Sequence, residues 1–62
     1  MKRSELEKKL KRLGWYFLKH GGSHDFWTNG DDIEPIPRHP KIHELLANKI
    51  LRRAEKSKQR RE

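Results

Sequence analysis

A single histidine follows a glycine-rich turn in residues 21–27, which read Gly-Gly-Ser-His-Asp-Phe-Trp. Histidine can both accept and donate a proton near neutral pH, because its unperturbed pKa is about 6.5. Gly21 and Gly22 would let the backbone approach a phosphate closely, and their N–H groups could bind its oxygens. His24 is therefore a candidate general base for a ribose 2′-hydroxyl. The alternative is a turn-flanking histidine without a chemical role.

The charge of the chain favours a polyanionic partner, which is either nucleic acid or a strongly acidic protein. The 62 residues include 16 Lys and Arg against 9 Asp and Glu, a formal net charge of +7. Lys19 and Arg38 flank the histidine segment and are candidates for phosphate contact, and His39 could bind phosphate or assist His24. His20 and His43 are expected to be surface residues.

Several classes of site and location are disfavoured by the composition. The chain has no cysteine, which removes disulfides, thiolate metal sites and a cysteine nucleophile. His20 and His24 are four residues apart, but the two glycines between them exclude a shared helix face, so we expect neither a metal nor a cofactor. The longest apolar run, residues 15–18, is too short for a membrane span or a signal peptide. We expect a soluble, cytoplasmic protein with no membrane partner.

The elements that must position these residues begin with a helix over residues 4–13. Ser4 and Glu7 have the spacing of a capping box, and leucines at positions 6, 10 and 13 form one apolar stripe. Gly14 can supply the left-handed conformation that ends a helix. Three extended segments follow at residues 15–20, 24–28 and 33–37.

The turns and the second helix complete the pattern. Asn29-Gly30 is typical of a hairpin with a primed turn, and two prolines place residues 33–37 at a sheet edge. A helix is predicted from about residue 41 to 55. Its apolar face would contain Ile42, Leu45, Leu46, Ile50 and Ala54. The basic residues 56–62 either prolong that helix or fray.

The apolar stripes of the two helices can both be buried only if the helices pack against the same face of the sheet. The prediction is an α+β fold of order α-β-β-β-α, with a three-stranded antiparallel sheet and two helices packed on one face. This is the outline of the double-stranded-RNA-binding fold. One domain spans residues 1–62, with a core over about 3–55 and a basic tail over 56–62. Most of the aromatic rings should pack beneath the helices, which leaves at most one or two to stack on bases.

Taken together, these segments resemble the HicA family of type II toxins over about residues 1–55. In chain order, the segments that carry the resemblance are 1–6, 13–15, 22–24, 36–40 and 49–51. The resemblance implies a metal-independent endoribonuclease that cleaves messenger RNA, with His24 catalytic and Gly22 and Ser23 forming the turn that presents it. It also implies growth arrest through inhibited translation, and neutralisation by a HicB antitoxin that covers the active surface.

The resemblance further implies a toxin that is monomeric alone and hetero-oligomeric with its antitoxin. Two other functions fit the composition. A non-catalytic RNA-binding module would block translation by occupancy, with His24 only as a contact. An interaction protein would use its positive charge mainly for an acidic antitoxin. The acid that protonates the leaving group is not identified.

Overall fold

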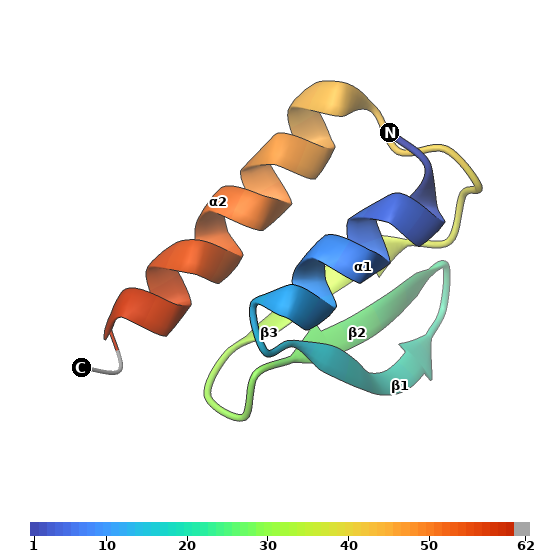
Figure 1. Cartoon of the computed structure of the whole chain (residues 1–62). Helices are drawn as coiled ribbons and strands as arrows, with labels where there is room; N and C mark the ends of the chain where they lie inside the picture. Colours follow the sequence, from blue (N-terminus) through green and yellow to red (C-terminus); the bar gives the residue numbers. More distant parts are fainter. Residues whose placement is uncertain (61–62) are drawn as a thin grey trace.

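The chain forms a three-stranded antiparallel sheet with two helices on one of its faces (Figure 1). The structure, a computed structural model, describes the backbone of residues 1–60 and the side chains of residues 1–57. In chain order the elements are α1 (Arg3–Arg12), β1 (Tyr16–Gly21), β2 (His24–Thr28), β3 (Ile33–Pro37) and α2 (Glu44–Arg60). The sheet order is β1-β2-β3, so β3 lies at an edge as its prolines require. The predicted α+β fold and its α-β-β-β-α order are confirmed.

The helix α1 begins without the predicted capping box. Lys2 occupies the N-cap position and makes no side-chain cap bond, and Ser4 lies inside the helix. The Arg3 N–H donates to the Pro40 carbonyl oxygen at 2.9 Å. The Glu7 carboxylate lies 3.6 Å from the Arg3 guanidinium instead of reaching back to the backbone. The start of α1 is therefore held by the segment before α2, a partner that is distant in sequence.

The helix α2 is longer than predicted, and the predicted apolar face is confirmed only in part: Ile42, Ile50 and Ala54 are buried. Leu45 and Leu46 are 68% and 38% exposed, so placing them in the core was wrong. The buried α2 residues, at spacings of three and four, are Ala47, Ile50, Ala54 and Ser57. Three of these four side chains are small, and the element with which α2 packs most extensively is α1. Residues 56–60 of the predicted tail are helical, and residues 61–62 lie outside the described residues.

The core lies between the helices and the sheet. Its buried residues are Leu6, Leu10, Trp15, Trp27, Ile36, Ile42, Ala47, Ile50 and Ala54. Only the two tryptophans among the five aromatic residues are buried beneath the helices. Tyr16 is 52% and Phe17 44% exposed, and Phe26 is half-buried. The number of aromatic rings in the core was therefore overestimated.

The loop between β2 and β3 is a four-residue hairpin connection, residues 29–32. The Asn29 side-chain oxygen accepts hydrogen bonds from the N–H groups of Asp31 (3.0 Å) and Asp32 (2.9 Å). Gly30 has a φ of 100°, whereas no described residue other than glycine has a positive φ. A type I′ turn needs positive φ at both central residues, so the hairpin was predicted correctly and its primed turn was not.

Candidate active site

A two-residue turn, Gly22 and Ser23, joins β1 to β2 and presents His24. The strands pair Gly21 with His24 and His20 with Asp25, which leaves only those two residues between them. Gly22 has a φ of 39°, in the left-handed region that favours glycine. His24 is the first residue of β2 and is exposed. The predicted segment therefore forms the tip of the first hairpin.

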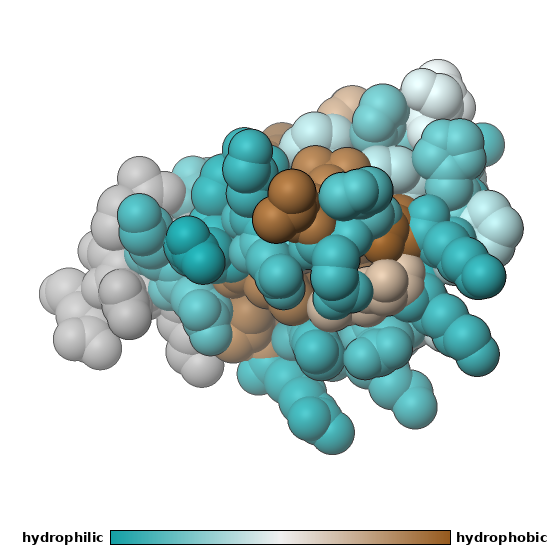
Figure 2. Space-filling view, turned by 90° about the horizontal axis from the view of Figure 1, so that it is seen from above, coloured by the Kyte–Doolittle hydropathy of each residue, from teal (hydrophilic) through white to brown (hydrophobic). Residues whose placement is uncertain are grey.

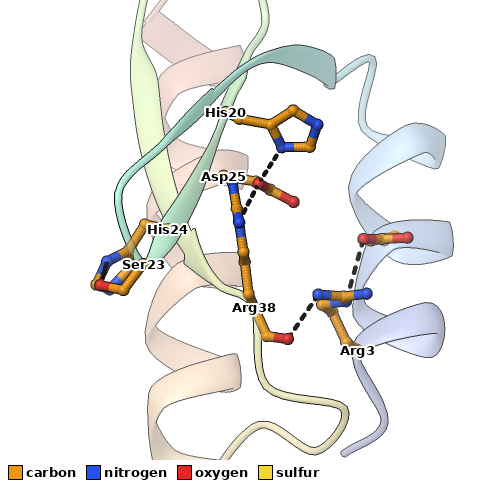
Figure 3. Close-up of polar contacts among 7 residues, drawn as sticks. Arg3, His20, Ser23, His24, Asp25 and Arg38 are labelled. Atoms are coloured by element: carbon orange, nitrogen blue, oxygen red, sulfur yellow. Dashed lines mark hydrogen bonds and ion pairs between the residues drawn. The ribbon is translucent and has the colours of Figure 1, made fainter.

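Side chains along β2 alternate between the two faces of the sheet. Trp27 is buried against the helices, and Asp25 shares its face. His24 and Phe26 lie on the opposite face, which no helix covers. In Figure 3 the side chains of Ser23 and His24 point away from Asp25 and α1. The hairpin thus carries different chemistry on each side.

The open face holds His24 beside an aromatic ring and a cation. The Ser23 Oγ and the His24 Nδ1 lie 3.2 Å apart, within hydrogen-bonding distance. Lys19 is the cross-strand partner of Phe26, and its Nζ lies 5.9 Å from the ring centroid. A Cβ atom at Gly21 would overlap the Phe26 ring, so the missing side chain makes room for that ring across β1. Lys19 is therefore the predicted phosphate contact that shares the face of His24.

The helix-covered side of the same hairpin holds a cluster of His20, Asp25 and Arg38. The Asp25 Oδ1 accepts from the His20 Nδ1 at 2.8 Å and from the Arg38 Nε at 2.9 Å. These contacts, led by the His20 hydrogen bond, hold the pKa of Asp25 below its ordinary value, while partial burial opposes them. Asp25 is thereby kept ionised in the folded protein.

The structure separates Arg38 from the face of His24, and His39 makes no hydrogen bond or ion pair with either residue. The Arg38 guanidinium is bound to Asp25 on the helix-covered side, and its backbone carbonyl oxygen accepts from the Arg3 Nη1 at 2.7 Å. His39 lies in the bend between β3 and α2, exposed and without a hydrogen bond or ion pair to any described residue. The predicted site residues therefore do not form one cluster.

Two residues of the helix-side cluster had not been predicted from the sequence to be functional. His20 was predicted to be a surface residue, and Asp25 had no assigned role. The contact between His20 and Asp25 could have been predicted from the length of the turn, because a two-residue turn places Asp25 directly opposite His20. Arg38 could not have been added in this way, since its contact joins residues 13 apart in sequence.

A separate cavity of about 350 Å³ lies between β3 and the C-terminal half of α2. It is lined by Asp32, Glu34, Arg53 and Ser57, among others, and it does not include His24. The Ser57 hydroxyl donates to the Asp32 carboxylate and accepts from the Asn29 amide at 2.8 Å.

Within the described residues, no group of three His, Cys, Asp or Glu side chains is placed to hold a metal ion. None of the described helices has the length and apolar composition of a membrane span.

Fold and site together define a small, cationic α-β-β-β-α protein that presents an exposed histidine at a hairpin tip. Residues 3–55 match the family described as HicA toxin of bacterial toxin–antitoxin. The chain belongs to this HicA toxin family, and it is therefore a toxin of a toxin–antitoxin system. Comparisons with curated proteins and with solved structures gave no significant match.

Proposed function

We propose that this toxin is an endoribonuclease that cleaves messenger RNA in the cytoplasm, with His24 as the general base. The observation that carries the proposal is the position of His24, exposed on the open face directly after the Gly22-Ser23 turn. The imidazole takes the proton of a ribose 2′-hydroxyl, and the 2′-oxygen forms a bond to the adjacent phosphorus. The bond from phosphorus to the 5′-oxygen breaks, and that oxygen takes up a proton. No step in this scheme needs a metal.

Neighbouring groups support the reaction on the same face. Because the Ser23 hydroxyl lies at the His24 Nδ1, it can hold the imidazole with Nε2 directed to the substrate. Lys19 supplies positive charge for the developing phosphorane, since its side chain is exposed on the strand beside His24. The backbone N–H groups of the glycine-rich turn can bind phosphate oxygens.

The partner in this proposal is a HicB-like antitoxin that covers the open face of the sheet. Two features support it: the net charge of +7, which favours an acidic partner, and the half-buried Phe26 and exposed Lys19 on the face of His24. The toxin would be monomeric alone and hetero-oligomeric with the antitoxin. Covering His24 then blocks both substrate binding and proton transfer.

Replacing His24 by alanine tests the mechanism directly. His24→Ala should lower the rate of RNA cleavage by at least about 100-fold, the usual contribution of a positioned base, and abolish growth arrest. The substrate is a DNA oligonucleotide with a single ribonucleotide, which an enzyme using the 2′-hydroxyl cuts at that one position. Cleavage is followed by gel electrophoresis, and far-UV circular dichroism checks the fold.

A matched control removes another exposed histidine. The His43 Nδ1 accepts from the Leu45 N–H at 3.4 Å near the start of α2, and asparagine can supply the same acceptor. His43→Asn should therefore cleave RNA like the wild type. Full activity in His24→Ala would refute the mechanism. Tight RNA binding by the wild type without any cleavage would favour the occupancy module instead.

A further inference from the structure

One oxygen of Asp25 holds an imidazole and a guanidinium at the hairpin tip. The Oδ1 accepts from the His20 Nδ1 and from the Arg38 Nε, at 2.8 and 2.9 Å (Figure 3). The Asp25 side chain is only 14% exposed, whereas those of His20 and Arg38 are 70% and 44% exposed. The carboxylate therefore lies beneath two groups that reach solvent.

Both side chains have further nitrogen atoms that Asp25 does not bind. Because the His20 ring is bound through Nδ1, its Nε2 lies on the far side of the ring and carries a proton when the imidazole is charged. The Arg38 Nε donates to Asp25, and the Arg38 Nη groups make no hydrogen bond to the described residues. This is the arrangement in which an arginine can offer further N–H donors to a phosphate.

A structural role alone does not account for His20. The Arg38–Asp25 ion pair is enough to tie the segment after β3 to β2. The His20 ring adds little burial, since its other described contact is a tilted one with the exposed Phe17 ring, at 4.9 Å between centroids. Arg3 brings a further guanidinium to the same region, through its bond to the Arg38 carbonyl oxygen. Arg3 is itself paired with Glu7, so the two guanidinium groups balance the two carboxylates, and a protonated His20 would add the excess positive charge.

We propose that His20 and Arg38 form a phosphate clamp for the RNA backbone, with Asp25 as the positioning residue that orients both. This inference rests on the proposed function, whose substrate is RNA. The clamp lies on the opposite side of the hairpin from His24, and the tip between them consists of Gly21, Gly22 and Ser23. The RNA strand crosses this tip, so that the clamp holds a phosphate next to the one that is cleaved.

The Asp25→Asn variant gives the sharpest test, because a clamp and a simple charged surface predict changes of opposite sign in the affinity for RNA. Removing a carboxylate raises the net charge by one and would strengthen RNA binding to a merely cationic surface. Loss of the orienting carboxylate should instead weaken binding about tenfold, the size of one charge-assisted hydrogen bond. Affinity is measured by fluorescence anisotropy with a labelled single-stranded RNA at pH 5.5, below the ordinary histidine pKa of about 6.5. All variants carry His24→Ala to prevent cleavage.

Two further variants keep the test independent of folding. His20→Gln leaves the Arg38–Asp25 pair intact and should also weaken binding, and the log–log salt slope should fall by about 0.7, one lost contact to a single strand. Glu5→Gln removes an exposed carboxylate from α1 and should bind RNA as tightly as the parent or tighter. Thermal unfolding of each variant confirms that binding is measured on folded protein.

The outcomes separate the clamp from the proposed function. If Asp25→Asn and His20→Gln bind RNA as tightly as the parent, with an unchanged salt slope, the clamp is refuted while RNA cleavage by His24 stands. If the His24→Ala parent binds no RNA even at low salt, both proposals fail. Weaker binding by both variants, together with unchanged or tighter binding by Glu5→Gln, establishes the clamp.

Discussion

At the scale of single residues, neighbours in β2 face opposite sides of the sheet. His24 lies on the open face, and Asp25 lies under His20 and Arg38 on the other. The general base could be proposed from sequence, because a glycine-rich turn and a histidine are adjacent in the chain. The cluster around Asp25 could not, since it needs both the hairpin register and a contact from beyond β3.

Glu34 is a second residue whose surroundings have a measurable consequence. Its side chain is 13% exposed, its Oε1 is buried without a hydrogen-bond partner, and its Oε2 lies 3.5 Å from the Arg53 Nε. Burial raises the pKa of Glu34, and Asp32 adds to the rise while Arg53 opposes it. The Glu34 carboxyl group therefore binds a proton more tightly in the folded protein than in the unfolded chain. The contribution of Glu34 to stability therefore falls as pH rises from about 4.5 through its folded pKa.

Replacing Glu34 by glutamine should remove this cost of ionisation. We expect Glu34→Gln to have a higher Tm than the wild type at pH 7, by up to about 5 °C, and an equal Tm at pH 4. Thermal unfolding at the two pH values measures the difference. Glu55→Gln, on an exposed part of α2, should show no such pH dependence. A lower Tm for Glu34→Gln at pH 7 would mean that the Arg53 ion pair outweighs the burial.

At the scale of elements, the first hairpin depends on the fit between Gly21 and Phe26. The ring of Phe26 occupies the space that a side chain at Gly21 would need. The backbone of Gly21 is not in the left-handed region, so the requirement for glycine here is one of space alone. This fit keeps the ring on the open face beside His24.

The Gly21→Ala variant should therefore destabilise the protein by about 1–3 kcal/mol, the usual cost of overpacking. In a Phe26→Ala background the same substitution should cost much less, because the space is then empty. Urea unfolding of the two single variants and the double variant gives the coupling free energy. If the free-energy costs of Gly21→Ala and Phe26→Ala add up in the double variant, the Phe26 ring moves aside freely to make room for a side chain at position 21.

The elements themselves were largely predictable, and their ends and faces were not. Leucines at helical spacing were enough for α1, and Pro35 and Pro37 were enough to place β3 at an edge. The cap of α1 was missed because its backbone partner, Pro40, lies far along the chain. Leu45 was placed in the core because periodicity counts leucine above alanine, whereas the buried residue in this turn of α2 is Ala47.

At the scale of the whole molecule, a small core supports a highly charged surface. Seen from above the fold, hydrophilic side chains surround a few hydrophobic ones (Figure 2). A domain of this size buries only about 60% of the surface of its unfolded chain, so each fully buried side chain is a large share of stability. Leu6 and Leu10 are both completely buried.

Two leucine substitutions compare the core with the surface. Leu10→Ala should cost about 2–5 kcal/mol, a large part of the stability of about 5–15 kcal/mol usual for a domain. Leu45→Ala should cost less than about 0.5 kcal/mol, since Leu45 is 68% exposed. Chemical denaturation measures both. Equal costs would show that the sequence-based placement of Leu45 in the core was right after all.

The contact between the two ends of the core has a consequence for the order of folding. The Met1 carbonyl oxygen accepts from the Ile42 N–H at 2.7 Å, and Lys2 forms a bridge with Lys41. The hairpins join neighbouring strands and can form within microseconds, whereas this contact must close a loop of most of the chain. We expect the hairpin that carries His24 to form early and the start of α1 to dock late. During synthesis, Met1 and Lys2 would leave the ribosome before Lys41 and Ile42, so the start of α1 could not dock until those later residues were available.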